Sequence, residues 1–380
     1  MEGRTEIGLY IHIPFCKAKC FYCDFNSFAG AEDLVPSYFH ALKNEAALYG
    51  GDLADCTVKT VYIGGGTPSF VDTRYLYEIL NTCRQCFNIG KNAEISIETN
   101  PGTLTYEKLM AYKSMGINRL SIGLQAYQDS LLRKLGRIHD FHQFLENYNQ
   151  AVRTGFKNIN IDLIFGLPGQ TLRDWAQTLL NVIQLGPAHV SCYSLKIEEG
   201  TPFGKSLEDG ELIPIEDELD REMYYMAIEK MGAAGLKHYE ISNFARPGYQ
   251  CRHNLIYWKA EEYLGLGAGA HSYLFGERYN NVYGLDGYIK NSRNKDSLKE
   301  NVQIIGKAES MAEYMILGLR LTDGIHAGEF KSRYGEDLYE IYHEKIHKLL
   351  RKNLLVMEKD GIKLSSSGMD LANTVFMEFI

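Results

Sequence analysis

The sequence has no apolar stretch that approaches the roughly 20 residues needed to cross a membrane as a helix. Its first ten residues, MEGRTEIGLY, lack a basic region followed by an apolar core, so we expect no secretory signal. It also lacks a basic excess, because 40 Lys and Arg stand against 48 Asp and Glu and give a formal net charge of -8. An acidic chain is a poor general binder of nucleic acid or anionic membranes. These absences predict a cytoplasmic protein with no transmembrane segment and no nucleic-acid partner.

Size and cysteine content set the next bounds. With 380 residues and 45% hydrophobic content, the chain can bury a large core, and we expect more than one domain. Its eight cysteines should remain thiols or metal ligands, since the chain is long and carries no signal for an oxidising compartment. We expect Cys83 and Cys86 to pack in a helix core, because the apolar residues around them recur with helical spacing. The same core packing is expected of Cys56, Cys192 and Cys251.

Three further cysteines, Cys16, Cys20 and Cys23, follow one another in CxxxCxxC spacing directly after an alternating apolar run. This spacing places three thiols on one short loop at the end of a strand. A structural zinc site needs four ligands, and no fourth Cys or His lies within the next fifteen residues. Thiolates are the usual ligands of iron-sulfur clusters, and a cluster held by three of them keeps one iron open to another ligand. The spacing therefore favours an iron-sulfur cluster.

Two alternatives for this loop stay open. A redox pair formed by Cys20 and Cys23 would leave Cys16 unexplained. Packing of the three cysteines as small apolar side chains is disfavoured, because the charged residues Lys17, Lys19 and Asp24 lie between and beside them and indicate a solvated loop.

Strand-like and helix-sized segments alternate through the first half of the chain. Strands separated by roughly 20 to 30 residues indicate βαβ crossovers and a parallel sheet. Counting the strand before the cysteine loop, six strands predict an α/β fold with a partial (β/α)6 barrel. The five further strands are expected within residues 57–70, 93–99, 118–125, 158–169 and 189–195.

Polar residues follow several of these strands. They include the cysteine loop, the turn from Gly64 to Thr67, Glu98, Gln125 and Asp162. In a β/α barrel the carboxyl ends of the strands form one face, where such folds place their chemistry. We therefore expect a site built around the cysteines. The glycine turn matches neither GxGxxG nor a P-loop, so it gives little support to phosphate binding.

The alternation fades after Leu195. We expect three parts: a barrel over residues 1–235, a loop-rich connecting segment over residues 236–300, and a small C-terminal unit over residues 301–380. The last part is expected to hold helices near residues 308–319 and 338–352, a hairpin at Asp360-Gly361 and a short helix from Gly368. Helices followed by a hairpin predict a winged-helix-like unit.

The cysteine spacing, with Tyr22 just before Cys23, resembles the radical S-adenosylmethionine (SAM) superfamily. The phrase YIHIPFC before it is similar to the branch that holds oxygen-independent coproporphyrinogen III dehydrogenases and their relatives, the heme chaperones. The dehydrogenase pattern has Cys two places after the third cysteine, where the chaperone pattern has Phe. This chain has Phe25 there.

The resemblance implies two cofactors, a 4Fe-4S cluster held by Cys16, Cys20 and Cys23, and SAM bound at its open iron. It also implies an electron donor for the cluster, whose electron would cleave SAM to a 5'-deoxyadenosyl radical. In that family the GGTP turn holds the methionyl ammonium, and an arginine matching Arg137 suits the carboxylate. The residues that match the family's SAM-binding positions are Tyr10, Tyr22, Gly65, Gly66, Thr67, Glu98, Gln125, Arg137 and Asp162.

A further phrase, HNLIYW from His253 to Trp258, resembles the HNxxYW phrase of the chaperone branch and is a candidate for heme contact. Imidazole can ligate heme iron, so His253 is a candidate axial ligand. A single histidine is, however, more often a structural hydrogen-bonding group. His271, in GAGAHSY, is a second candidate.

The resemblance thus implies a heme chaperone that binds the cluster, SAM and heme and passes heme to an acceptor protein. One alternative is a coproporphyrinogen III dehydrogenase. Phe25 disfavours it, as does the lead of only fifteen residues before Cys16, where that family carries a longer segment. The other alternative is a non-catalytic iron-sulfur or zinc scaffold, which would leave Arg137, Glu98 and the glycine turn without a purpose.

Overall fold

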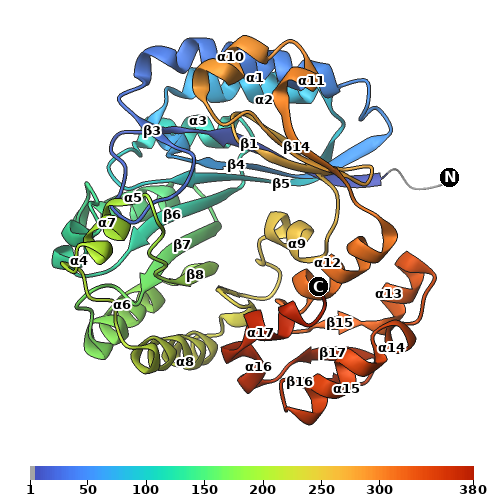
Figure 1. Cartoon of the computed structure of the whole chain (residues 1–380). Coiled ribbons are helices and arrows are strands. Elements are labelled where there is room, and N and C mark those ends of the chain that lie inside the picture. The colour runs from blue at the N-terminus through green and yellow to red at the C-terminus, as the bar shows by residue number, and fades with distance from the viewer. Residues whose placement is uncertain (1–4) are drawn as a thin grey trace.

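A computed structural model describes residues 5–380 of the protein. Six parallel strands, adjacent in chain order, form its centre (Figure 1). They confirm the predicted α/β partial barrel. The six strands are β1 (Thr5–Ile13), β4 (Cys56–Gly65), β5 (Ile89–Thr99), β6 (Arg119–Gln125), β7 (Asn158–Phe165) and β8 (His189–Ser194).

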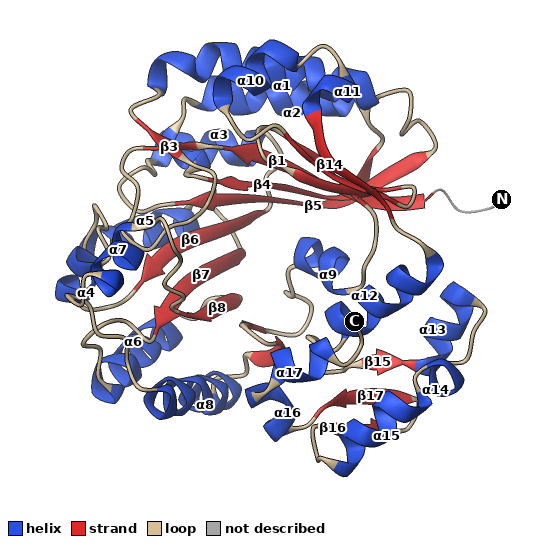
Figure 2. Cartoon of the chain, in the orientation of Figure 1, coloured by secondary structure: helices blue, strands red, loops and turns tan. Residues whose placement is uncertain are grey.

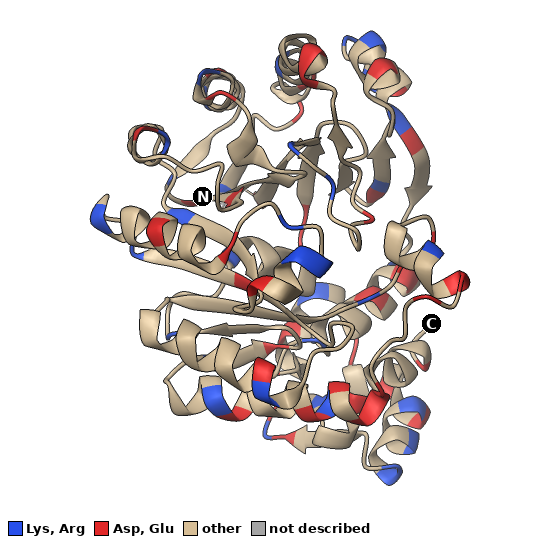
Figure 3. Ribbon diagram, turned by 90° about the vertical axis from the view of Figure 1, so that its left-hand side faces the viewer, with Lys and Arg blue, Asp and Glu red and all other residues tan. Residues whose placement is uncertain are grey.

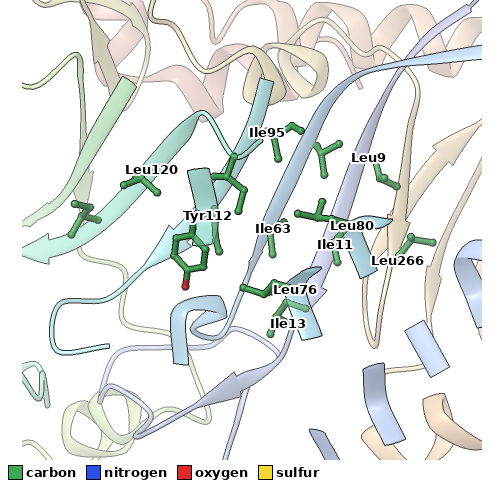
Figure 4. Close-up of a cluster of buried hydrophobic side chains, with 14 of the residues drawn as sticks. Leu9, Ile11, Ile13, Ile63, Leu76, Leu80, Ile95, Tyr112, Leu120 and Leu266 are labelled. Atoms are coloured by element: carbon green, nitrogen blue, oxygen red, sulfur yellow. The ribbon is translucent and has the colours of Figure 1, made fainter. Parts of the chain in front are cut away.

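The two faces of these strands differ in polarity. On β1, Leu9, Ile11 and Ile13 are each 0% exposed and pack beneath the helices, whereas Tyr10 and His12 point to the opposite, inner face. Full burial of an aliphatic side chain of this size stabilises a fold by about 1.5–3 kcal/mol. Figure 4 shows the apolar layer with residues from neighbouring elements, among them Ile63, Leu76, Leu80, Ile95, Leu120 and Leu266.

Helices cover the outer face of the sheet (Figure 2). Their ends carry local signals, as in α6, where Thr171 and Asp174 form a capping box at the start and Gly186 ends the helix in the left-handed conformation. The helices of the barrel are α1 (Val35–Tyr49), α2 (Thr73–Cys86), α3 (Tyr106–Ser114), α4 (Asp129–Lys134), α5 (Phe141–Arg153), α6 (Leu172–Leu185), α7 (Pro202–Glu208) and α8 (Asp217–Ala233).

The sheet continues beyond both edges of the barrel and reaches twelve strands within the described residues. Beside β8 lie β10 (Asn243–Ala245) and then β9 (Lys237–Glu240). On the other side, β11 (Tyr263–Leu266) pairs in parallel with β1. It is followed by the antiparallel strands β12 (His271–Leu274), β13 (Glu277–Asn281) and β14 (Lys299–Ile304).

The expectation of a loop-rich segment over residues 236–300 is therefore wrong. Besides six strands, this segment holds α9 (Arg252–Trp258), α10 (Leu285–Asn291) and α11 (Lys295–Leu298), and HNLIYW lies on α9. Its residues lack a simple period because they face buried polar partners. Glu45 of α1, for example, is 0% exposed and accepts hydrogen bonds from Gly267 N and Asn281 Nδ2. The domain boundaries themselves stay a prediction.

The C-terminal unit forms a second, smaller layer (Figure 1). Its own core includes Met315, Leu319, Phe330, Leu349, Ile362 and Val375, all 0% exposed. Its helices and strands are α12 (Lys307–Gly318), β15 (Ile325–His326), α13 (Ala327–Tyr334), α14 (Leu338–Ile341), α15 (His343–Arg351), β16 (Leu355–Glu358), β17 (Gly361–Leu364), α16 (Ser366–Asp370) and α17 (Ala372–Met377). The small sheet has the order β15-β17-β16, so the predicted hairpin is present, and its turn lies at Lys359-Asp360.

Contacts join this unit to the barrel. Arg221 of α8 forms an ion pair with Asp370 at 3.0 Å, and the Ile241 amide donates to the Arg320 carbonyl at 3.2 Å. Both signs of charge occur on the outer helices in the view of Figure 3. No helix among residues 5–380 combines the length and the apolar character that crossing a membrane requires.

Candidate cofactor site at the carboxyl ends of the strands

The cysteine loop begins where β1 ends. Its base is closed by two short parallel strands, β2 (Phe15–Cys16) and β3 (Phe28–Ala29). Phe21 fixes the middle of the loop, because its amide donates to the Leu135 carbonyl at 3.0 Å and its carbonyl accepts from the Phe203 amide at 2.9 Å. The backbone of the loop is thus tied to the rest of the fold at Phe21, between Cys20 and Cys23.

The three thiols differ in exposure. Cys16 is 7% exposed and accepts a hydrogen bond from Thr67 Oγ1 at 3.5 Å, while Cys20 and Cys23 are half-buried. Burial raises the pKa of Cys16 and of Cys23. All eight cysteines, which lie within the described residues, are free, as expected from the sequence.

The glycine turn after β4 packs directly behind the first cysteine. The Gly66 amide donates to the Ile13 carbonyl at 2.9 Å, and the Thr67 amide donates to the Phe15 carbonyl at 2.8 Å. A Cβ atom on Gly66 would lie 2.9 Å from Cys16 Sγ and 2.8 Å from the Phe15 carbonyl oxygen. Glycine is therefore required for the turn and the cysteine loop to approach each other this closely.

Arg137 links the cysteine loop to the strand ends. Its Nη1 donates to Cys20 Sγ at 3.5 Å, and its Nη2 donates to Asn100 Oδ1 and to the Gly123 carbonyl, each at 2.7 Å. Its Nε is buried and makes no hydrogen bond within residues 5–380. An unpartnered buried donor on a cation beside the thiols suits an anionic ligand such as a carboxylate.

Asn100 was not predicted from the sequence, yet it holds two of the predicted residues together. Its Nδ2 donates to Thr67 Oγ1 at 2.9 Å while its Oδ1 accepts from Arg137. Its only signal in the sequence is its place two residues after Glu98, in the polar segment ETNPG at the end of a strand.

Glu98 faces the same turn from β5. Its Oε1 accepts from the Tyr62 hydroxyl at 2.9 Å and its Oε2 accepts from the Gly65 amide at 3.0 Å. Burial raises the pKa of Glu98 to about 7, and the nearby Asp162 carboxylate adds to this rise. The carboxylate is thus desolvated and placed beside the backbone of the glycine turn.

Gln125 and Asp162 extend this inner face. Gln125 has a positive φ of 74°, a conformation that is uncommon for a residue with a side chain and clusters at functional sites. Asp162 accepts from Ser121 Oγ at 2.7 Å and from Asn160 Nδ2 at 2.8 Å. The Asp162 carboxylate also contributes to the raised pKa of Glu98.

Tyr10 lies deeper on the inner face of β1. Its hydroxyl is bonded to His12 Nδ1 at 2.9 Å, and its ring stacks on that of Tyr62 at 6.3 Å. Burial raises its pKa. Tyr22 is half-buried and packs against the small apolar cluster that includes Leu131 and Leu135. Burial raises its pKa as well, although the Arg137 guanidinium opposes the rise.

His253 lies apart from the cysteines, on α9, and is 1% exposed. Both of its ring nitrogens are engaged, Nδ1 with Thr60 Oγ1 at 2.7 Å and Nε2 with the Tyr257 hydroxyl at 2.9 Å. Burial lowers its pKa to about 3, so the ring is neutral. Axial ligation of heme by His253 stays a prediction, and it requires one of these two hydrogen bonds to give way to iron.

The donor set fits a three-cysteine cluster. Each thiolate of such a cluster binds a different iron, so the three sulfur atoms surround the cluster and do not converge on one ion. Over residues 5–380, no group of three or more His, Cys, Asp or Glu is drawn together to hold a single metal ion. The loop, the glycine turn and Arg137 thus present thiols and hydrogen-bond donors to one place at the barrel rim.

Comparison with known proteins agrees with this geometry. The model of the radical SAM superfamily matches residues 10–182, and that of the HemN C-terminal domain matches residues 305–371. The chain is a radical SAM protein with a HemN-type C-terminal domain. More narrowly, it belongs to the HemW family, since it is 37% identical to the heme chaperone HemW of Bacillus subtilis over 98% of both chains.

Other relatives and a solved structure agree. The heme chaperone HemW of Synechocystis is 40% identical over 83% of this chain and 78% of its own. Coproporphyrinogen III oxidase HemN from Escherichia coli has the same fold, with a TM-score of 0.86 over 99% of this chain and 90% of that chain. At 23% identity this last likeness shows the fold alone. Radical SAM membership gives the chain its 4Fe-4S cluster and SAM.

Cys16, Cys20 and Cys23 would hold the cluster, which would supply an electron for the cleavage of SAM. The chain's own residues are placed to hold and orient the cofactors. Arg137 offers a fork of donors for a carboxylate, and the Gly65–Thr67 turn lets a ligand approach the backbone. Glu98 and Asp162 offer acceptors for an ammonium or for hydroxyl groups.

Proposed function

We propose that this protein is a heme chaperone that binds heme and passes it to an acceptor protein. The observation that carries the proposal is identity over nearly the full length to proteins named heme chaperone, 37% over 98% of both chains for the Bacillus subtilis relative. The acceptor and the electron donor for the cluster are proposed only as classes. We further propose that the chain works in the cytoplasm, where a reducing environment would preserve the cluster thiols.

Each predicted cofactor residue has a proposed role. Cys16, Cys20 and Cys23 hold the cluster, and Arg137 pairs with the carboxylate of SAM. Glu98, Gln125 and Asp162 accept hydrogen bonds from its ammonium or ribose, and the Gly65–Thr67 turn lies against its methionyl group. Tyr10 and Tyr22 line the adenosyl side. The closeness of Arg137 to both Cys20 and Asn100 supports this assignment, because it puts the carboxylate partner beside the loop that holds the cluster.

Coproporphyrinogen dehydrogenation is the second candidate, since HemN shares the fold. Against it stands Phe25, which is 61% exposed at the place where the dehydrogenase pattern carries a fourth cysteine. A phenyl ring has no thiol that could act as a ligand or transfer a proton. We therefore propose that the chain does not decarboxylate porphyrinogens.

Hemin titration of the anaerobically reconstituted protein tests the proposal. We expect a saturable, stoichiometric Soret shift and transfer of the bound heme to apomyoglobin, a generic acceptor that reports its release. Uptake that never saturates would mean that heme only partitions onto apolar surface, and the chaperone assignment would fall.

A further inference from the structure

An exposed histidine lies at the rim of the barrel, beside the cysteine loop. His271 begins β12, directly after the loop that leaves β11, and its Nε2 is bonded to the Tyr283 hydroxyl at 3.3 Å. Tyr283 is itself 47% exposed. A Cβ atom on Gly269 would lie 3.0 Å from the Tyr283 ring, so this ring packs directly against the backbone of Gly269.

Asn26 joins this rim to the end of the cysteine loop. Its Nδ2 donates to the carbonyls of Ala268 and Tyr283, both at 3.0 Å, while its own carbonyl is bonded to His12 Nε2 at 2.8 Å. The residue before it, Phe25, is 61% exposed. Phe25 and Asn26, which follow the third cysteine, are thereby held next to the His271 side of the rim.

A cation completes the group. Lys19 lies on the exposed part of the cysteine loop, and its Nζ donates to the Phe25 carbonyl at 3.0 Å. The rim thus combines an imidazole, two exposed aromatic rings and an ammonium group: His271, Tyr283, Phe25 and Lys19.

Three of the buried histidines of the barrel offer no comparable nitrogen, and in a fourth, His139, the nitrogen without a hydrogen bond, Nδ1, is itself buried. His12, His189 and His253 are 7%, 0% and 1% exposed, and both ring nitrogens of each are hydrogen-bonded. By contrast, Nδ1 of His271 makes no hydrogen bond within residues 5–380, and the bond at its Nε2 is long. Iron needs a neutral imidazole with an accessible lone pair. Partial burial and the nearby Arg278 lower the pKa of His271, which favours that neutral form.

We propose that His271 is an axial ligand of heme iron, with the rings of Tyr283 and Phe25 against the porphyrin and Lys19 toward a propionate. The chemistry matches each part of heme: imidazole is a common iron ligand, aromatic rings pack on a flat π-system, and an ammonium pairs with a carboxylate. This inference rests on the proposed heme chaperone function. It places the heme beside the cluster loop and away from α9.

The test compares single variants of the reconstituted, heme-free protein with the wild type. Each protein is titrated with hemin, and the spectrum of its ferrous heme complex is recorded. His271→Ala should weaken hemin binding at least about tenfold and change the Soret position, and added imidazole should restore the wild-type spectrum. Phe25→Ala should weaken binding while leaving the ligand spectrum unchanged. The matched control is His142→Ala, because the His142 side chain is 79% exposed and lies on α5, away from this group, and it should behave as wild type.

The outcomes separate this inference from the proposed function. If the wild type takes up no stoichiometric hemin, the chaperone proposal fails and this inference with it. If the wild type binds hemin and His271→Ala keeps both its affinity and its spectrum, only the His271 assignment fails. In that case a spectral change in His253→Ala would assign the iron to the histidine on α9. Circular dichroism of each variant confirms that the fold is retained.

Discussion

Arg137 and Cys20 are in direct contact, with Nη1 of the arginine 3.5 Å from the thiol sulfur. The same side chain also bonds Asn100, so a single guanidinium spans the cysteine loop and the end of β5. This contact connects Arg137, which follows β6 and α4, with the cysteine loop that follows β1. The first prediction follows from it.

Replacing Arg137 by alanine should reduce SAM affinity while leaving the iron content unchanged, because the three thiols remain. The expected loss is about 1.5–3 kcal/mol, the scale of a hydrogen bond to a charged group. Calorimetry on the reconstituted protein measures it. Arg137→Lys should recover only part of the affinity, since lysine keeps the charge but loses the planar fork. Equal affinity in wild type and Arg137→Ala would place the carboxylate elsewhere.

The second prediction concerns the cluster. Reconstituted protein should hold about four irons per chain, and replacing Cys16, Cys20 or Cys23 by alanine should abolish the cluster absorbance. Cys86→Ala is the matched control, because this half-buried cysteine lies at the end of α2, away from the loop. A triple variant that retains its iron would refute the assignment, and stoichiometric zinc without iron would favour a scaffold.

Glu98 predicts a pH dependence of SAM binding. Burial raises its pKa to about 7, so the carboxyl group is largely protonated below that pH and ionised above it. The ionised form accepts the stronger hydrogen bonds from an ammonium or a hydroxyl group. Affinity should therefore increase as pH rises through about 7. Glu98→Gln should bind more weakly and flatten this dependence, and a variant that keeps the wild-type pH profile would clear Glu98.

Glu45 predicts a pH dependence of stability. It is 0% exposed, and burial raises its pKa from 4.5 to about 7. The native state then holds a proton that the unfolded state releases, so the free energy of unfolding falls as pH rises from 4.5 to about 7. Since one pKa unit corresponds to about 1.4 kcal/mol, the loss is about 3 kcal/mol.

Denaturant unfolding at several pH values measures this loss. Glu45→Gln removes the titration and offsets stability by a pH-independent amount, so the gap between variant and wild type should change with pH only inside that window. The pKa shift of the carboxyl group sets the pH range of this test, from about 4 to about 8. A difference in the free energy of unfolding that stays constant over this range would contradict the account.

Much of the barrel could be predicted from the sequence, because its signal is local. The alternation of Leu9, Ile11 and Ile13 indicates a strand, and the cysteine spacing, together with the resemblance it carries, points to the cluster. Parallel strands bring their carboxyl ends to one edge, so Glu98, Gln125 and Asp162 could be assigned to the same face in advance.

The contributions of other residues could not be predicted, since their partners are distant in the chain. Gly267 and Glu45 are 222 residues apart, yet their hydrogen bond helps to attach the β11–β14 extension to α1. Asn100 acts through Thr67 and Arg137, and Asn26 acts through Ala268 and Tyr283. Buried polar residues of this kind follow neither the helical nor the strand period, which is why residues 236–300 were expected to form a loop-rich segment.

The most direct test of the central claim is an anaerobic assay of the reconstituted protein with coproporphyrinogen III, SAM and a reductant, run beside the hemin titration. Phe25 supplies no thiol where the dehydrogenase pattern has one, so the account predicts no formation of protoporphyrinogen IX together with stoichiometric heme binding. Catalytic turnover of the porphyrinogen with heme uptake that never saturates would contradict it.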